Sequence, residues 1–146
     1  HIIRTLLDFK PESNRTDIIQ AVETLTRMQK RRCTAFMLSD FYQQKPFTKE
    51  LQICNRKHDV VAIQVYDRRD TALPDIGLMR VRDAETGHEQ YLDTSSKKVR
   101  NAYSEQWKKR QDRLHETFTH SGVDSVAIST NDDYVKYLMM LFKKRK

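Results

Sequence analysis

The sequence lacks any apolar run near the roughly 18 residues that a membrane-spanning helix needs. Its N-terminal stretch, HIIRTLLDFK, is too short for a secretory signal and carries its charges internally. Only two cysteines are present, Cys33 and Cys54, and their spacing does not match a metal site. We therefore expect a cytoplasmic protein without a membrane segment, whose cysteines stay reduced and fill small apolar spaces in the interior.

Repeats, low-complexity segments and linkers are also missing, so the 146 residues predict a single domain, residues 1–146. The five histidines are scattered through unrelated elements, which argues against a zinc site. His58 precedes a predicted strand, and no serine or cysteine is placed to make it a catalytic base. The absence of such a constellation predicts a protein that is not an enzyme. Because the sequence begins at His1 and not at methionine, we also expect it to be part of a longer protein.

Basic charge is present but is unevenly placed. The net charge is +7 at pH 7, and residues 97–113 hold seven basic and two acidic residues. The tail, residues 136–146, holds five basic residues and no acidic one. Each segment therefore carries +5, and the remainder of the chain sums to −3. The basic character belongs to one helix and one tail.

Hydrophobic periodicity predicts alternating helices and strands. Helices are expected over residues 1–9, 16–31, 47–58 and 96–120 and after Asn131 or Asp132, and strands over 33–38, 59–67 and 123–129. Thr16 is the expected N-cap of the second helix, and Gly122 the stop of the long one. Residues 78–83 and 88–93 predict a β-hairpin that turns through Glu85, Thr86 and Gly87.

Strands separated by helices predict an α/β fold, with right-handed crossovers and a parallel sheet covered on both faces. In such sheets functional groups collect where the strands end, at the carboxyl edge. Asp40, Asp67, Thr130 and Asn131 all follow predicted strands. We therefore take Asp67, Thr130 and Asn131 as candidate partner-binding residues, and Asp40 as a candidate metal ligand.

The run CTAFML, residues 33–38, is apolar at every position except its threonine and does not alternate. An exposed edge strand of this composition promotes aggregation, so we expect this strand to be flanked on both sides. The chain offers it one obvious neighbour. We therefore predict that another chain covers it by self-association, or that a preceding strand belongs beside it.

Three stretches together, RTDIIQAVETL, RRCTAFMLSDF and KHDVVAIQVYDRRDTALPDIGLMRVRDAETGHEQYLD, carry a family resemblance. The sequence resembles the domain-of-unknown-function family 58 (DUF58), a bacterial group with a von Willebrand factor A-like domain. The resemblance also includes the terminal GVDSVAISTNDDYVKYLMMLFKKR. It implies a Rossmann-like fold of the von Willebrand factor A type, here partial, with three parallel strands flanked by helices and an inserted β-hairpin.

The resemblance further implies a metal-ion-dependent adhesion site with three parts: an Asp-x-Ser-x-Ser motif, a threonine and an aspartate. Thr16 matches the threonine and Asp40 the aspartate, whereas the Asp-x-Ser-x-Ser motif has no counterpart. On that alignment the missing strand beside residues 33–38 would carry the motif. Arg15, close to Thr16 where the family usually has glycines, weakens the case for a metal further.

Mg²⁺ prefers six oxygen ligands, of which Thr16 and Asp40 supply one hydroxyl and one carboxylate. Mg²⁺ is therefore an expectation for a full-length protein, and no cofactor is firmly expected in these residues. For both residues a second interpretation stays open, a helix N-cap for Thr16 and an ordinary turn residue for Asp40. Asp67, in the same way, has a simple pairing with Arg68 or Arg69 as its alternative.

Three functional hypotheses follow. The first is a non-enzymatic protein–protein interaction module, and the resemblance implies a MoxR-type AAA+ ATPase as the partner. The second is a metal-assisted hydrolase or nuclease that uses Asp40 and Asp67 to activate water. The third is nucleic-acid binding through the basic helix of residues 97–113, which interleaves Tyr103 and Trp107 with lysines and arginines.

Overall fold

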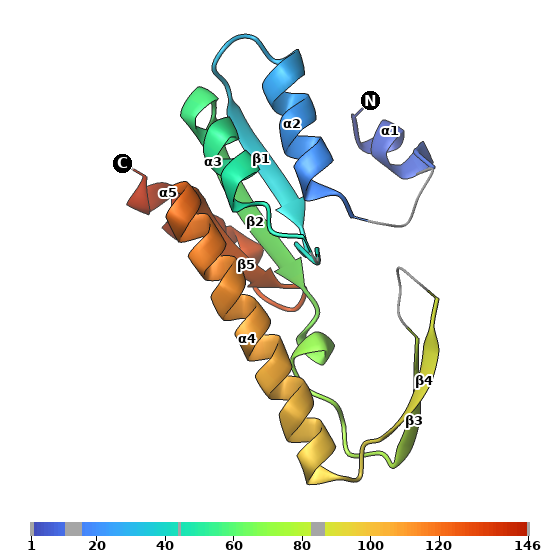
Figure 1. The fold of residues 1–146 in the computed structure, drawn as a ribbon. Helices are drawn as coiled ribbons and strands as arrows, with labels where there is room; N and C mark the ends of the chain where they lie inside the picture. Colours follow the sequence, from blue (N-terminus) through green and yellow to red (C-terminus); the bar gives the residue numbers. More distant parts are fainter. Residues whose placement is uncertain (1, 11–15, 44, 83–86, 146) are drawn as a thin grey trace.

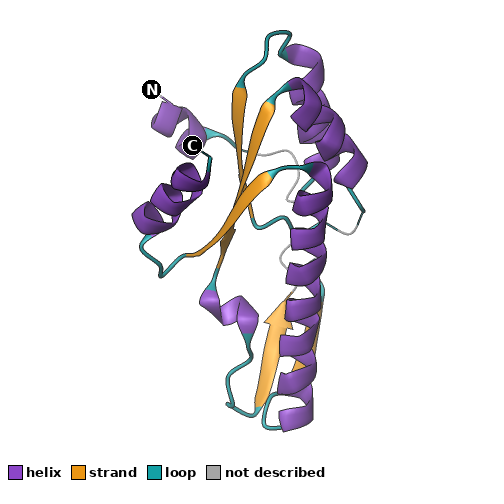
Figure 2. Ribbon diagram, turned by 90° about the vertical axis from the view of Figure 1, so that its left-hand side faces the viewer, coloured by secondary structure: helices purple, strands orange, loops and turns teal. Residues whose placement is uncertain are grey.

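The computed structural model describes residues 2–10, 16–43, 45–82 and 87–145 (Figures 1 and 2). In chain order the elements are α1 (Ile2–Asp8), α2 (Ile18–Met28), β1 (Thr34–Ser39), α3 (Thr48–Lys57), β2 (Asp59–Tyr66), the 3₁₀ turn η1 (Arg68–Thr71), β3 (Leu78–Arg82), β4 (Glu89–Asp93), α4 (Lys97–Ser121), β5 (Asp124–Ser129) and α5 (Tyr134–Lys144). Even α4, with 25 residues, is too polar to cross a membrane, and no other described helix is both long and apolar enough.

A parallel sheet in the order β1-β2-β5 forms the centre of the molecule (Figure 1). Thr34 of β1 lies opposite Asp59 of β2, and Tyr66 at the end of β2 lies opposite Ser129 of β5. The connections run through α3 and α4, as the crossovers of a parallel sheet require. The predicted α/β class is therefore confirmed, as a partial Rossmann-like arrangement, and β3 and β4 form the predicted antiparallel hairpin.

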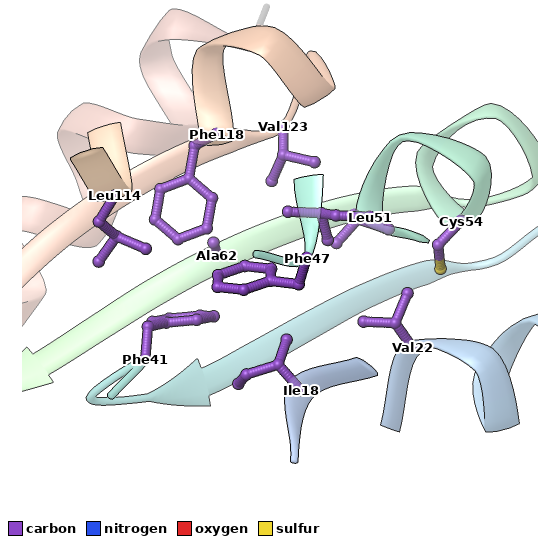
Figure 3. Close-up of a cluster of buried hydrophobic side chains, with 11 residues drawn as sticks. Ile18, Val22, Phe41, Phe47, Leu51, Cys54, Ala62, Leu114, Phe118 and Val123 are labelled. Carbon is purple, nitrogen blue, oxygen red and sulfur yellow. The ribbon is translucent and has the colours of Figure 1, made fainter. Parts of the chain in front are cut away.

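The sheet is covered by helices on both faces (Figure 2). Helices α2, α3 and α4 lie on one face, and α5 lies on the other. The larger core fills the first interface (Figure 3), with side chains from all three helices packed on β2. Its buried members are Ile18, Val22, Phe41, Phe47, Leu51, Cys54, Val60, Ala62, Leu114, Phe118 and Val123. A smaller cluster of Val61, Ile63, Ile128 and Leu141 fills the interface beneath α5.

The strand β1 departs from the sequence-based expectation. Within the described residues it pairs with β2 alone, so the predicted second neighbour is not supplied by the described part of this chain. Its two faces also differ, because Met37 packs against the larger core whereas Phe36 and Leu38 are 47% and 66% exposed. A strand read as apolar on both faces thus has one face that is largely open. The prediction that a second chain covers it stays a prediction.

Two predicted N-caps are wrong by one or two residues. The N-cap of α2 is Asp17, not Thr16, since the Asp17 carboxylate accepts a hydrogen bond from the Gln20 amide at 2.8 Å. The N-cap of α5 is Asp133, which accepts from the Val135 amide, and not Asn131 or Asp132. In each case neighbouring residues are similarly good caps, and the backbone geometry selects one of them.

The end of α4 agrees with the prediction. Gly122 adopts a left-handed conformation with φ of +65°, which a glycine adopts without steric cost. The amide of the next residue, Val123, donates back to the carbonyl of Phe118 at 3.0 Å, which completes a Schellman-type stop. This turn directs the chain into β5.

The hairpin is attached to the rest of the molecule at its base. The buried Thr94 closes this base, because it donates to the carbonyl of Gly77, the residue opposite it, from its amide at 2.8 Å and from its hydroxyl at 2.7 Å. Arg100 of α4 then donates to the Thr94 carbonyl at 2.6 Å. Arg100 at the start of α4 pairs with Asp75 at 3.0 Å. Of the predicted turn, Glu85 and Thr86 lie outside the described residues. Figure 1 shows the strands extending beside the N-terminal half of α4 and set apart from it.

Arg145 joins the end of α5 to the amino ends of two strands. Its guanidinium pairs with Asp124 of β5 at 2.8 Å and with Asp59 of β2. The hydrogen bond and the charge of Arg145 hold the pKa of Asp59 below its ordinary value of 3.8, and the hydroxyl of Thr34 adds to this effect. The carboxylate is therefore more acidic in the folded than in the unfolded chain.

Replacing Arg145 with glutamine is expected to lower the free energy of unfolding at neutral pH by about 1 kcal/mol, because both carboxylates are more than a third exposed and partly screened. The Asp59 contribution exists above its unfolded pKa and disappears as the pH falls through the lower folded value. Urea unfolding across this range should show the wild type losing its advantage in acid. Lys144→Gln is the control, since Lys144 forms no ion pair within the part of the chain described here. An advantage that persists unchanged in acid would contradict the assignment.

Candidate functional site

The carboxyl edge of the sheet carries the predicted site residues. Because β1, β2 and β5 are parallel, Asp40, Asp67 and Thr130 follow strand ends at one edge of the sheet (Figure 1). The strands do not end level. Ser39 lies opposite Gln64, so Asp40 follows at the level of Val65, two residues before Asp67. The structure thus brings the predicted residues to one edge, at different heights.

Asp40 sits in a tight turn directly after β1. Its carboxylate is exposed and accepts hydrogen bonds from the Tyr42 amide at 3.1 Å and from the Ser39 hydroxyl at 3.4 Å. The Ser39 hydroxyl in turn accepts from the amide of Phe41 at 3.0 Å. Between them Phe41 adopts φ of +53°, a conformation rare for an aromatic residue, and its ring is buried. The turn is therefore built to send Asp40 outward and Phe41 inward.

The start of α2 lies against this turn, as the family resemblance implies for Thr16. The side-chain carbonyl of Gln43 accepts a hydrogen bond from the Ile18 amide at 2.5 Å. The amide nitrogen of Gln43 donates to the carbonyl of Lys45 at 3.1 Å, which fixes its orientation. Gln43 therefore holds the segment that follows Thr16 against the loop that begins at Asp40.

A dedicated metal site needs more ligands than this region provides. Among the described residues no group of three or more histidine, cysteine, aspartate or glutamate side chains is placed to hold a metal ion. Asp40 contributes one carboxylate, which already accepts two turn hydrogen bonds, against the six oxygens that Mg²⁺ prefers. Thr16 and Asp40 alone therefore do not fit a Mg²⁺ site, and the Mg²⁺ expectation depends on ligands from elsewhere.

Of the other three predicted residues, Asp67 caps a local turn, whereas Thr130 and Asn131 form hydrogen bonds through their backbone amides. The Asp67 carboxylate accepts from the Arg69 amide at 2.8 Å and begins η1, in a capping box with Asp70. Thr130 donates its amide to the Tyr66 carbonyl at 3.0 Å, and the Asn131 amide approaches the Ser129 hydroxyl at 3.4 Å. The side chains of Thr130 and Asn131 are exposed, so they are available to a partner.

A cleft that sequence reasoning missed lies beside this edge. It has a volume of about 1110 Å³ and is enclosed by the loop of residues 41–47, the hairpin and the middle of α4. We call it the basic cleft, because its lining includes Lys45, Arg82, Lys109, Arg110 and Arg113. No acidic residue belongs to the lining as far as the described residues extend. The charge run of α4 was visible in the sequence, but its convergence with Lys45 and Arg82 was not.

Aromatic rings line the same cleft and have neighbours of their own. The guanidinium of Arg110 lies over the ring of Tyr42, 5.0 Å from its centroid. Trp107 packs against Tyr66 with 5.7 Å between ring centroids. Burial raises the pKa of Tyr103, and the nearby carboxylate of Asp70 acts in the same direction. The Tyr103 phenol therefore stays protonated at neutral pH and is able to donate a hydrogen bond.

The model of the family described as "Protein of unknown function DUF58" matches residues 1–113. The chain belongs to the DUF58 family. The matched region runs from α1 through most of α4, so it includes the Asp40 turn, the hairpin and all of the basic residues that line the cleft. This confirms the predicted family, whereas the von Willebrand factor A-like description stays an expectation.

Relatives of this DUF58 chain are uncharacterized mycobacterial proteins. One from Mycobacterium avium is 29% identical over 136 residues, covering 93% of this chain and 80% of the relative. Others from Mycobacterium bovis and Mycobacterium tuberculosis are 38% identical over 77 residues, covering 53% of this chain and 24% of each relative. The chain thus spans about a quarter of the length of these last relatives. The search of solved structures found no match.

A cysteine–histidine pair lies at the opposite, amino edge of this DUF58 sheet. Cys33 Sγ is 3.5 Å from Nδ1 of His58, whose ring is completely buried. Sequence spacing did not predict a cysteine beside His58, because the two residues are 25 positions apart in the chain and meet only where β1 and β2 begin. Cys33 is also partly exposed, unlike the buried Cys54. The pair links the starts of the two strands.

Proposed function

We propose that this DUF58 chain is a cytoplasmic, non-enzymatic protein–protein interaction module that binds a partner along the free edge of β1 and the adjoining carboxyl-edge loops. The observation that carries the proposal is the state of β1. Phe36 and Leu38 are 47% and 66% exposed on a strand that has one described neighbour. An exposed strand edge with apolar side chains is a template for an added strand from another chain.

The neighbouring surfaces support the same use. Phe36 meets Phe142 of α5 edge-to-face, with ring centroids 6.0 Å apart, so the strand is continuous with an apolar side of α5. On the same side of that helix, one turn before Phe142, Met139 is 65% exposed. Methionine side chains adapt to many partner shapes. A partner strand laid on β1 would therefore also cover an apolar flank, which adds burial to backbone hydrogen bonds.

The carboxyl-edge residues would then set which partner is accepted. Leu38 ends the exposed stretch one residue before the turn that presents Asp40, so a strand bound there continues past Asp40. Asp67, Thr130 and Asn131 lie further along the same edge. These polar groups can be matched by hydrogen bonds from a correct partner and are left unpaired by an incorrect one, which is how polar rims give specificity.

For the partner we propose a MoxR-type AAA+ ATPase, which rests on the family resemblance, and a second copy of this chain in its absence. A von Willebrand factor A-type domain grips partners through the loops at its carboxyl edge, and this is the edge that Asp40 occupies. A metal bridge at Thr16 and Asp40 is part of the proposal only for a longer protein that supplies the remaining ligands.

The hydrolase alternative receives less support. Asp40 and Asp67 each accept hydrogen bonds from the backbone of their own turns, and they follow their strands at different heights. Two carboxylates that are to activate one water must face the same point. Turnover of a phosphoester in the presence of Mg²⁺, abolished by Asp40→Ala, would replace the interaction module with this alternative.

The test uses Leu38→Lys, which places a charge on the exposed face of β1 beside its free edge and leaves the core untouched. Leu78→Lys is the matched control, since Leu78 on the hairpin is 71% exposed against 66% for Leu38. We expect wild type and control to bind the purified ATPase, and to self-associate in light scattering, whereas Leu38→Lys loses about tenfold or more in affinity for both. The proposal would be refuted if the wild type stays monomeric and if the wild type and Leu38→Lys bind the ATPase with equal affinity.

A further inference from the structure

We propose that the basic cleft binds an acidic polypeptide segment of a partner protein in an extended conformation. This inference concerns a different surface from the β1 edge and stands without it. The cleft lies between the hairpin and α4, and its cations come from three separate parts of the chain. Lys45 belongs to the loop after β1, Arg82 to β3, and Lys109, Arg110 and Arg113 to α4.

Among the residues that the structure describes, the five cleft cations have no acidic partner, which is unusual for so many in one place. Other arginines of the molecule, such as Arg80 and Arg100, form ion pairs with Glu89 and Asp75. None of the five cleft cations forms an ion pair within residues 2–10, 16–43, 45–82 and 87–145. Like charges gathered in a concave surface repel one another and focus a positive potential, which an anionic ligand relieves. The charge therefore points to an anionic occupant.

An aromatic ring holds one of these cations, Arg110, in position. The ring of Tyr42 supports the guanidinium of Arg110 at 5.0 Å, an attraction that limits the freedom of a long side chain. A guanidinium positioned through its face keeps its N–H edge free for a bidentate bond to a carboxylate. Arg113, one helical turn further, lies in the same lining and provides a second such group.

The remaining lining favours a peptide over a nucleic acid. Base stacking needs open aromatic faces, but Arg110 covers a face of Tyr42 and Trp107 packs against Tyr66. The lining instead offers the amide side chains of Gln90 and Gln106, which can both donate to and accept from a peptide backbone. A volume of about 1110 Å³ is enough for several extended residues, since pockets for small ligands hold roughly 300–1,000 Å³.

The experiment measures binding of a fluorescein-labelled oligo-glutamate peptide by fluorescence anisotropy, with an oligo-deoxythymidine of equal charge as comparator. We expect the peptide to bind more tightly than the oligonucleotide and to dissociate as salt is added. The double variant Arg110→Glu with Arg113→Glu should weaken peptide binding by about tenfold or more. Lys45→Glu, on the opposite wall of the cleft, should weaken it in the same direction.

The matched control is Lys98→Glu with Lys108→Glu. Both lysines are exposed on α4 and lie outside the cleft lining, and the double variant changes the net charge by the same amount. Equal losses from the two double variants would overturn the proposal in favour of non-specific attraction. Tighter binding of the oligonucleotide, lost with the cleft variants, would overturn it in favour of nucleic acid. No binding of the peptide would also overturn it. Circular dichroism confirms that each variant is folded, and Lys45→Glu decides the outcome should the double variant unfold.

Discussion

Replacing Phe41 with alanine is expected to lower the free energy of unfolding by about 3–5 kcal/mol, the largest effect we anticipate for a single residue. The ring is 4% exposed and sits in the larger core. It stacks on Phe47 at 6.4 Å between centroids and meets Phe118 edge-to-face at 5.1 Å. Truncation removes these contacts and leaves a cavity beneath the Asp40 turn, since Phe47 at the start of α3 and Phe118 in α4 are held by their helices and cannot easily close it.

Urea unfolding measures the change, with Phe9→Ala as the control because Phe9 is 70% exposed. The control should stay within about 0.5 kcal/mol of wild type. A second comparison tests the backbone at this position. Since Phe41 has φ of +53°, glycine should be no less stable there than alanine, the reverse of the usual order in strands and helices. A loss of less than about 1 kcal/mol for Phe41→Ala would show that the ring is not a core member.

Replacing Asn55 with alanine should cost about 2–3 kcal/mol, because one side chain satisfies three backbone groups, at the start of β2 and at the end of α4. Its carbonyl oxygen accepts from the amide of the buried Val60 at 3.0 Å. Its amide nitrogen donates to the carbonyl of Gly122 at 2.7 Å and approaches that of Ser121 at 3.3 Å. Asn55 thereby joins α3 to the start of β2 and to the end of α4.

The conservative change Asn55→Asp separates these roles. An aspartate still accepts from Val60 but faces the two carbonyl oxygens with a negative charge, so its protonated form is favoured in the folded state. The folded chain then binds the proton more tightly than the unfolded one, and the Asn55→Asp variant should gain stability relative to Asn55→Ala as the pH is lowered. Thermal unfolding at several pH values measures this difference. Asn101→Ala, an exposed change on α4, is the control, and equal stability of Asn55→Ala and wild type would contradict the bonding scheme.

The fold could be predicted from the sequence where the signal is local and strong. The apolar run of residues 59–67 predicted a strand of a parallel sheet, and that strand, β2, lies between the other two. The long helix and its stop at Gly122 followed from periodicity and one glycine. The choice of Asp17 and Asp133 as N-caps did not follow, because adjacent residues differ little as caps, and the path of the chain decides between them.

The environment of β1 was predicted less well. Composition alone indicated a strand with neighbours on both sides, but composition cannot say which chain supplies the second neighbour. In the structure the apolar side chains of Phe36 and Leu38 are largely exposed to solvent, and the proposed function depends on this exposure. The sequence pattern therefore predicted that this strand is apolar, but it did not indicate which chain lies beside it.

The candidate site was predictable only where the family resemblance linked distant residues. The resemblance placed Thr16 and Asp40 in one site, and the bond from Ile18 to Gln43 shows that their segments meet. The Cys33–His58 pair and the basic cleft had no such guide, since their residues are separated in the chain and carry no local motif. A charge count along the chain identified α4 but not Lys45 or Arg82, which complete the cleft from other elements.

The hairpin is held to α4 at one end only among the described contacts, at its base beside Thr94. Arg100 donates to the Thr94 carbonyl at 2.6 Å and pairs with Asp75 at 3.0 Å, and both contacts lie at the same end of the hairpin. A small tilt of the hairpin about its base would displace each residue in proportion to its distance along the strands. Arg82 is the last residue of β3, far from the base, so it would move most. The width of the basic cleft therefore depends on the contacts that Arg100 makes with the hairpin base, although Arg100 itself lies outside the cleft lining.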